Sequence, residues 1–280
     1  MTEGELKENI ARAVRDARER APLAPSITNT VTMNFVANAQ LAVGGSAAMV
    51  FLPDEGERAA EIGGAMYINL GTHFPFYDET LPRTAARLRE LKKPWSLDPV
   101  GLGIGSLRTK LAAGFRDASP SIVRGNASEI IALARLWGVA ADGGTGGPKG
   151  VDSVDSVESA ESAAKALASF IGGAVAVSGV EDLVTDGSAV VRSRGGSHFM
   201  EKITGAGCAL GGVCAVYAAV ADPLTAALTA TQICNLAGSR AEKLASGPAS
   251  FQVHFLDELY KAAAEDVADN PLAVRGGAAQ

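Results

Sequence analysis

The 280-residue chain has few of the residues that stabilise small secreted proteins or bind structural metals. It has three cysteines, Cys208, Cys214 and Cys234, and this small, odd number does not suit a disulfide framework. Such sparse use of cysteine is typical of proteins in a reducing cytoplasm. The three histidines are scattered, so no Cys/His cluster has zinc-ligand spacing. Aromatic residues make up only 5% of the chain, which favours helices packed closely on a sheet over an aromatic-rich β-sandwich.

Long apolar segments and an excess of positive charge are also missing. Residues 1–20 carry acids and bases throughout and lack the apolar core of a signal peptide. The longest weakly polar run, residues 205–221, is rich in Gly and Ala and predicts a buried helix, because a membrane span needs ~20 apolar residues. The formal net charge of −6 excludes a basic surface for nucleic acid. We therefore expect a cytoplasmic protein that binds neither nucleic acid nor membranes.

The pattern of apolar segments predicts an α/β fold with a largely parallel central sheet. A hydrophobic content of 47% with 20% charged residues excludes a disordered chain. Buried strands are predicted at Ala48–Leu52, Ala65–Leu70, Trp95–Leu97, Ser121–Val123 and Gly173–Val177. Helical patterns separate them at Glu57–Gly63, Tyr77–Leu91, Ser128–Leu136 and Ser153–Ile171. Strands that alternate with helices in this way are typical of βαβ units.

The ends of the chain differ from this alternating middle. Helices are predicted over residues 1–20 and Asn29–Val43 near the start, and over Ala206–Ala221, Leu224–Ala245 and Phe251–Ala264 near the end. Asp186-Gly187 predicts a two-residue hairpin between two short strands. No linker divides the chain, so residues 1–280 are expected to form a single domain, with a flexible tail over 265–280.

The segments after the predicted strands carry the candidate functional residues, because open parallel sheets bind ligands beyond the carboxyl ends of their strands. Asp98 could hold Mg²⁺ or could be a turn residue that accepts hydrogen bonds from its own loop. Asn126 and Glu129 stand three apart at a predicted helix start, and this spacing alone favours helix capping over metal binding.

A glycine-rich turn, Thr204-Gly-Ala-Gly-Cys208, opens the long helix of small residues. Free N–H groups at such a helix start, together with the helix dipole, can form an anion hole for a phosphoryl group. The short motif alone favours a helix start that is simply packed against a neighbour. Cys208 is either a thiol with a pKa lowered by the helix start or a small buried side chain.

Taken in order, these motifs resemble those of the hydroxyethylthiazole kinases of the ribokinase-like superfamily, over residues from about 22 to 260. The matching stretches are Ser26-Ile-Thr-Asn29, Met33-Asn-Phe-Val-Ala-Asn38, Gly44-Gly-Ser-Ala-Ala-Met49, Asn69-Leu-Gly-Thr72, Asp98-Pro-Val-Gly101, Arg124-Gly-Asn-Ala-Ser-Glu-Ile130, Lys149-Gly-Val-Asp-Ser153, Thr204-Gly-Ala-Gly-Cys208 and Gly247-Pro-Ala-Ser-Phe251. The resemblance implies a three-layer fold and a cytoplasmic homotrimer with the substrate pocket near a subunit interface. It also implies Mg²⁺-dependent transfer of the ATP γ-phosphoryl group to 4-methyl-5-(2-hydroxyethyl)thiazole in thiamine salvage.

The same resemblance implies roles for individual residues. Asn29, Met49 and Gly205 match positions that bind the alcohol, and Arg124, Ser178 and Thr204 match positions that bind ATP. Asp98 and Glu129 match the Mg²⁺ positions, with Asn126 in support. Gly205, Ala206, Gly207 and Cys208 match the catalytic turn, in which related ribokinase-like enzymes carry an Asp base at the position of Cys208. The helix start lowers the pKa of this thiol and phosphate charge raises it, so its direction stays open. Our hypothesis is that Cys208 assists the alcohol and is dispensable for binding.

Departures from the family pattern concern the pocket more than the phosphoryl transfer. Pro25 replaces a polar residue, and the usual Val-Thr-Gly-Glu is Val177-Ser-Gly-Val180, with Glu181 and Asp182 displaced by one. The alternatives are therefore a ribokinase-like kinase for another small heteroaromatic alcohol, such as hydroxymethylpyrimidine, or a non-catalytic thiazole or nucleotide sensor. A dinucleotide-binding protein is excluded because no G-x-G-x-x-G follows the first strand.

Overall fold

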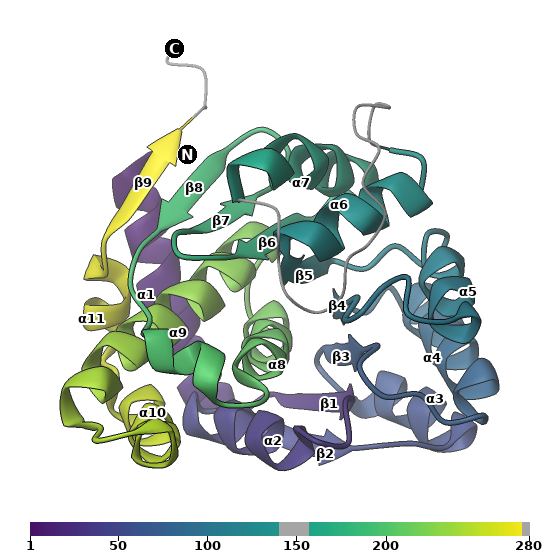
Figure 1. Cartoon of the computed structure of the whole chain (residues 1–280), viewed down its shortest axis with the longest axis horizontal. Helices are drawn as coiled ribbons and strands as arrows, with labels where there is room; N and C mark the ends of the chain where they lie inside the picture. The colour runs from purple at the N-terminus through teal and green to yellow at the C-terminus, as the bar shows by residue number, and fades with distance from the viewer. Residues whose placement is uncertain (140–156, 276–280) are drawn as a thin grey trace.

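A computed structural model describes residues 1–139 and 157–275, which form a nine-stranded mixed sheet (Figure 1). The strand order is β2-β1-β3-β4-β5-β6-β7-β8-β9. The strands are β1 Leu23–Ile27, β2 Ser46–Met49, β3 Met66–Asn69, β4 Trp95–Asp98, β5 Ile122–Asn126, β6 Ala174–Ser178, β7 Asp182–Thr185, β8 Val190–Ser193 and β9 Leu272–Arg275. Along this order, each neighbouring pair from β2 to β6, β1 included, is parallel, and each pair from β6 to β9 is antiparallel. The predicted α/β class with a largely parallel sheet is confirmed.

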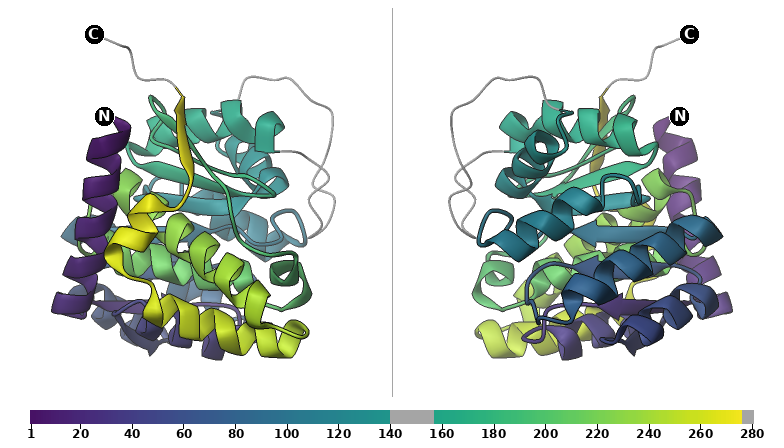
Figure 2. Two further views of the ribbon diagram at one scale, coloured as in Figure 1. Left: turned by 90° about the vertical axis from the view of Figure 1, so that its left-hand side faces the viewer. Right: turned by 90° about the vertical axis from the view of Figure 1, so that its right-hand side faces the viewer.

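Helices cover both faces of the sheet and complete the predicted three layers (Figures 1 and 2). One face is covered by α1 Glu3–Arg20, α2 Met33–Ala42, α8 Ala206–Ala218, α9 Pro223–Leu244, α10 Pro248–Lys261 and α11 Ala264–Asp269. The other face is covered by α3 Pro53–Ile62, α4 Tyr77–Leu91, α5 Ser106–Gly114, α6 Ala127–Leu136 and α7 Val157–Ile171. In the part of the chain that the structure describes, no helix is long and apolar enough to cross a membrane.

Alternation along the strands decides which side chains face α8. On β3, Tyr67 packs in the core beside α8, whereas Met66 and Ile68 pack in the core on the opposite face. The helix approaches this face closely, because a Cβ on Gly211 of α8 would stand 2.4 Å from the Tyr67 ring. The alternate residues at the ends of β3 to β6 therefore project into the layer between the sheet and α8.

Several predicted elements are confirmed, and others differ for identifiable reasons. Helix α4 spans Tyr77–Leu91 as predicted, and β7 and β8 form the predicted hairpin around Asp186-Gly187. Strand β1 was not predicted, because Pro25 lies inside it. The register explains why this proline is tolerated: β1 pairs with β3 only at Ser26 and Ile27, beyond the missing N–H.

The structure also differs from the predictions near both ends of the chain. Helix α2 begins at Met33, not at Asn29. Helix α5 was not predicted. The expected flexible tail over 265–280 was wrong as far as Arg275, because α11 packs against α1 and β9 pairs with β8 (Figure 2). The motif Lys149–Ser153 and the start of the helix predicted from Ser153 lie outside the described residues.

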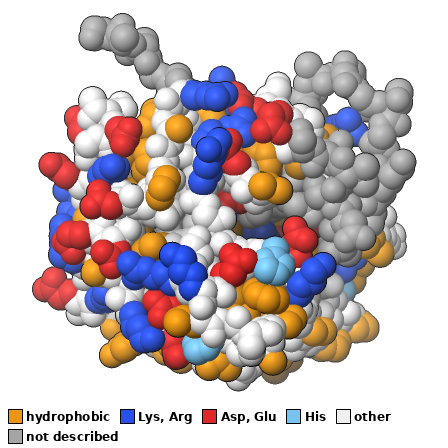
Figure 3. Space-filling model, turned by 60° about the vertical axis from the view of Figure 1, so that its left-hand side comes forward, with side chains coloured by type: hydrophobic (Ala, Val, Ile, Leu, Met, Phe, Trp, Pro, Cys, Tyr) orange, Lys and Arg blue, Asp and Glu red, His pale blue; other side chains and the backbone are white. Residues whose placement is uncertain are grey.

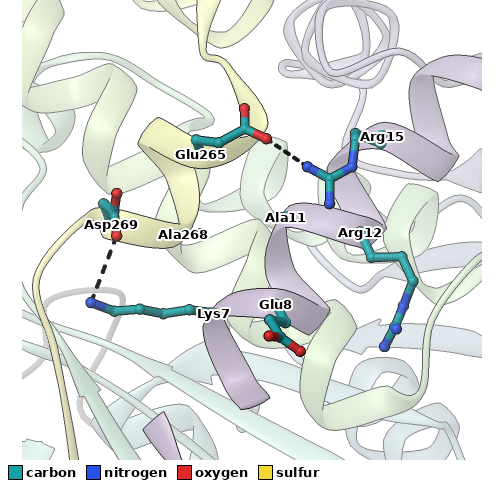
Figure 4. A pocket seen from close by; sticks show the side chains of 8 residues that line it. All are labelled: Lys7, Glu8, Ala11, Arg12, Arg15, Glu265, Ala268 and Asp269. Atoms are coloured by element: carbon teal, nitrogen blue, oxygen red, sulfur yellow. Dashed lines mark hydrogen bonds and ion pairs between the residues drawn. The ribbon is translucent and has the colours of Figure 1, made fainter. Parts of the chain in front are cut away.

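The seam between α1 and α11 holds a charged hollow of about 440 Å³ (Figure 4). Ion pairs cross it from Arg15 to Glu265 at 2.6 Å and from Lys7 to Asp269 at 3.7 Å. Acidic and basic side chains are similarly intermixed over the face shown in Figure 3. Exposed pairs of this kind each contribute about 0–1 kcal/mol. All the residues that line this hollow belong to α1 and α11, and none of them is predicted for the site. The hollow is therefore part of the packing between these two helices.

Candidate active site

The predicted functional residues gather where the parallel strands end. Strand β3 ends at Asn69, β4 at Asp98, β5 at Asn126 and β6 at Ser178. The register places Asn69 beside Asp98, and Asn126 beside Ser178. The amino-terminal turn of α8 lies over the same region, because a Cβ on Gly207 would stand 2.6 Å from the Arg124 guanidinium of β5.

Asp98 is fully buried and forms the centre of a polar cluster. Its Oδ2 accepts hydrogen bonds from the Tyr67 hydroxyl at 2.9 Å, from Asn69 Nδ2 at 3.0 Å and from Arg124 Nη1 at 3.2 Å. Burial raises the pKa of Asp98 to about 6, and the positive charge of Arg124 opposes this shift. The other oxygen, Oδ1, is buried and has no hydrogen-bond partner in the structure. Asp98 thus bonds to other strands, unlike a simple turn residue, and keeps one oxygen available for a ligand.

Arg124 connects this cluster to the turn at the start of α8. Its Nη2 donates to Ser178 Oγ at 3.0 Å, while Nη1 donates to Asp98. Burial alone would lower the pKa of Arg124, but the charges of Asp98 and Glu129 outweigh it, so the pKa lies above its ordinary value. Both terminal guanidinium nitrogens would be 2.6 Å from a Cβ on Gly207. A permanently charged guanidinium is therefore fixed against a helix start.

The turn before α8 leaves its backbone amides available for an anion. Gly205 is the N-cap residue, with a φ of +93°, and no side chain caps the helix. A Cβ at Gly205 would clash with Thr32 Cγ2 at 2.7 Å, so both space and conformation require glycine. The first N–H groups of α8 have no acceptor within the helix. Together with the Arg124 charge, they can stabilise a phosphoryl group.

Cys208 lies in the first turn of α8 and is buried. Its Sγ accepts a hydrogen bond from Asn69 Nδ2 at 3.4 Å, and the Thr32 hydroxyl also bonds to it. Burial, reinforced by the Asp98 carboxylate, raises the pKa of the thiol to about 11. Burial thus outweighs the lowering effect of the helix start, and the direction of the shift, which the sequence leaves open, is upward. Cys208 is protonated near neutral pH.

Asn126 and Glu129 form the capping box that their spacing predicts. Asn126 Oδ1 accepts from the Glu129 amide at 2.9 Å, and Glu129 Oε2 accepts from the Asn126 amide at 2.9 Å. Glu129 Oε1 accepts from the Gly101 amide in the loop after β4, at 3.2 Å. Its carboxylate is thereby held near Asp98, whose pKa it raises further. Within residues 1–139 and 157–275, no three His, Cys, Asp or Glu side chains form a ready metal cluster.

The residues predicted for the alcohol lie farther along the same edge of the sheet. Asn29 Oδ1 accepts from the Thr72 hydroxyl at 2.8 Å, and the Asn29 carbonyl accepts from the Thr32 hydroxyl at 3.2 Å. Asn29 is thus linked to Cys208 through Thr32. Met49 ends β2, which β1 separates from β3, and Thr204 is exposed before the turn. The structure joins neither of them to the Asp98 cluster.

Sequence reasoning missed several residues that shape the site. Tyr67 and Asn69 bond directly to Asp98, and two-residue alternation on β3 would have placed both on the α8 face. Asp182 Oδ1 accepts from the Gly179 amide at 2.9 Å, so this acid holds the turn after β6 despite the altered motif. The contact of Thr32 with Cys208 had no signal in the sequence, because the two residues are far apart along the chain.

A buried acid, a buried arginine and an uncapped helix start lie together at the carboxyl ends of parallel strands, in a three-layer α/β fold of the ribokinase-like class. A ribokinase-like superfamily protein from Enterococcus faecalis has this fold, with a TM-score of 0.61 at 12% identity over 93% of this chain and 95% of that one. More specifically, the chain belongs to the hydroxyethylthiazole kinase family, whose family model matches residues 14–265. It is therefore a kinase that uses ATP as co-substrate.

Two relatives show how much of the chain this membership covers. The hydroxyethylthiazole kinase of Bifidobacterium adolescentis is 54% identical over 275 residues, which are 95% of this chain and 94% of the relative. The solved hydroxyethylthiazole kinase structure from Pyrococcus horikoshii OT3 has a TM-score of 0.85 at 31% identity. The superposition covers 97% of this chain and 100% of the Pyrococcus chain. The resemblance found in the motifs is thus confirmed along nearly the whole chain.

Proposed function

We propose that the protein transfers the γ-phosphoryl group of ATP to the hydroxyethyl group of 4-methyl-5-(2-hydroxyethyl)thiazole, as in thiamine salvage. The names of its close relatives support this substrate. The observation that carries the proposal is the contact between the Arg124 guanidinium and the uncapped turn at Gly207, directly beside Asp98 and Cys208. This arrangement combines positive charge, free amides and a polar acceptor in one place.

Arg124, Ser178 and Thr204 bind ATP in this proposal. The hydrogen bond from Arg124 to Ser178 orients the guanidinium before the nucleotide arrives. The transferring group then lies at the turn before α8, where the backbone N–H groups of Gly205, Ala206, Gly207 and Cys208 donate hydrogen bonds to its negatively charged oxygens. Because phosphoryl transfer has a loose transition state, positioning and charge stabilisation supply most of its acceleration.

In this proposal Asn29, Met49 and Gly205 bind the alcohol. Cys208 is protonated near pH 7, so it does not act as a thiolate that is already formed. Its sulfur can instead accept a weak hydrogen bond from the alcohol and orient the hydroxyl toward the phosphorus. Because the transition state of phosphoryl transfer is loose, the attacking hydroxyl needs little activation, and this orienting hydrogen bond is sufficient.

Asp98 and Glu129 are the residues that would hold Mg²⁺. The unpartnered Oδ1 of Asp98 fits this role, and in the hydrogen bonds of the described residues the Glu129 oxygens accept from the backbone amides of Gly101 and Asn126, which leaves lone pairs for a ligand. Asn126 supports Glu129 through the capping box. Mg²⁺ keeps several waters and needs only one or two carboxylates besides the phosphates. When bound, the ion would neutralise phosphate charge in the transition state.

We further propose that the chain works as a single-domain cytoplasmic homotrimer, as the family resemblance implies, with the alcohol pocket near a subunit interface. Sedimentation of the purified protein tests the trimer directly. A species with the mass of a monomer at micromolar concentration would contradict it.

The test of the activity is product formation from ATP and the thiazole alcohol, followed by mass spectrometry with and without a chelator. We expect a phosphorylated alcohol that disappears when Mg²⁺ is removed. Arg124→Ala should raise the KM for ATP much more than that for the alcohol, because a charge-assisted bond of about 1.5–3 kcal/mol is lost. Arg116→Ala is the matched control, because Arg116 bonds to the Trp137 carbonyl outside the site. Absence of turnover would favour a sensor, and equal changes in both KM values would contradict the assignment of Arg124.

A further inference from the structure

Arg108, on the first turn of α5, joins two loops that the catalytic assignments leave unexplained. Its Nε donates to the Leu70 carbonyl at 2.7 Å, and its Nη2 donates to the Gly71 carbonyl at 2.9 Å. Its Nη1 donates to the Ile104 carbonyl at 3.0 Å and, at 3.4 Å, to that of Gly101. One guanidinium thus connects the loop after β3 with the loop after β4.

Each of these loops also bonds to a residue of the site. The Gly71 amide donates to Asn69 Oδ1 at 2.8 Å, which fixes the Asn69 amide with its Nδ2 toward Asp98 and Cys208. The Gly101 amide donates to Glu129 Oε1. Arg108 therefore holds the backbone at both points where these loops orient site side chains.

The electrostatic setting of Arg108 argues against a role in simple ion pairing. Within the described residues, no carboxylate forms a salt bridge with it, whereas Arg83 and Arg87 of the neighbouring α4 each pair with two glutamates. Partial burial lowers the pKa of Arg108. All of its hydrogen bonds in the structure go to backbone carbonyls, a geometry for which the rigid fork of an arginine is suited and a lysine is not.

We infer that Arg108 is a positioning residue that sets the distance between the loop after β3 and the loop after β4, and thereby the orientation of Asn69 and Glu129. Its effect on catalysis rests on the proposed function, because Asn69 and Glu129 matter for turnover only if the reaction occurs at the ends of these strands. Its effect on the loops does not depend on the reaction.

Arg108→Lys is the test, because it keeps the charge and removes the fork. Arg18→Lys is the matched control: Arg18 also donates to two backbone carbonyls, those of Tyr260 and Ala262, but lies near the start of β1 at the opposite edge of the sheet. Amide hydrogen exchange should become at least tenfold faster at Gly71 and Gly101 in Arg108→Lys and stay unchanged in Arg18→Lys. The kcat for the alcohol should fall at least tenfold in Arg108→Lys alone, with a smaller change in the KM for ATP.

A second variant covers the case in which Arg108→Lys does not fold. Arg108→Ala should regain activity and amide protection when guanidinium is added at low millimolar concentration, and ammonium should not restore either. Unchanged exchange at Gly71 and Gly101 in a folded variant would overturn the inference, as would a kcat equal to that of wild type. If the wild-type protein forms no product, the proposed function fails, but the exchange measurement still decides whether Arg108 holds the loops.

Discussion

Replacing Gly207 with alanine tests whether the Arg124 guanidinium must lie against the start of α8. The added Cβ would stand 2.6 Å from both Nη1 and Nη2 of Arg124, closer than any real Cβ contact. The guanidinium is the end of a flexible side chain, so Gly207→Ala is expected to fold by displacing it. That displacement breaks its hydrogen bonds to Asp98 and Ser178 and moves its charge away from the anion site.

The expected size of the effect follows from the lost contact. A charge-assisted hydrogen bond to phosphate contributes about 1.5–3 kcal/mol, which corresponds to a fall of about 10- to 150-fold in kcat/KM for ATP. Alanine is preferred over glycine inside a helix by about 1 kcal/mol, which partly offsets the lost hydrogen bonds. We therefore expect a large loss of ATP-dependent activity and a change in unfolding free energy of no more than about 2 kcal/mol.

Steady-state kinetics with varied ATP, combined with thermal unfolding, measures both quantities. Gly114→Ala is the control, because Gly114 also lies in a helix, α5, and a Cβ there meets no atom within 4 Å. Gly114→Ala should keep the activity of wild type and its stability or slightly more. Gly207→Ala with wild-type kcat/KM for ATP would refute the placement of the phosphate at this turn.

Three further predictions concern the buried groups around the same turn. Cys208→Ala should lower kcat while leaving the KM for both substrates within about threefold, because the neutral thiol loses only a weak hydrogen bond of the order of 0.5–1 kcal/mol; an unchanged kcat would end its proposed role. Because burial raises the pKa of Asp98 to about 6, kcat/KM should fall as the pH drops through 6, and a flat profile down to pH 5 would contradict this. Because the pKa of Asp98 is raised in the folded state, its protonation stabilises the fold, and this group's contribution to the thermal unfolding temperature should increase as the pH falls below about 6. Gly211→Ala should destabilise the protein by about 1–3 kcal/mol by pushing the Tyr67 ring away from Asp98, and calorimetry showing no loss would contradict the close packing of α8.

The fold could be predicted mainly where local pattern and tertiary role agree. Helix α4 and the hairpin at Asp186-Gly187 follow from periodicity and turn chemistry that act over a few residues. Strand β1 could not be predicted, because whether Pro25 is tolerated depends on how far β1 pairs with β3. Strand β9 likewise exists only because β8 offers an edge to pair with, which no local pattern near Leu272 reveals.

The candidate site shows the same division between local and distant information. The capping box of Asn126 and Glu129 is local, and its spacing predicts it correctly. The rule that ligands bind at strand ends was sufficient to place Asp98 and Arg124 at one edge of the sheet. The direction of the Cys208 pKa shift was not predictable, because it depends on the burial of this first turn of α8 against the rest of the fold and on a carboxylate 110 residues earlier in the chain.

The most direct test of the central claim is the ratio of kcat/KM for the thiazole alcohol to that for hydroxymethylpyrimidine, measured with ATP and Mg²⁺ in one assay. We expect the thiazole alcohol to be preferred at least tenfold, and the preference to persist in Gly207→Ala as both rates fall together. A preference for the pyrimidine would contradict the proposed substrate. Failure to phosphorylate either alcohol would contradict the account of the strand-end site as a centre for phosphoryl transfer.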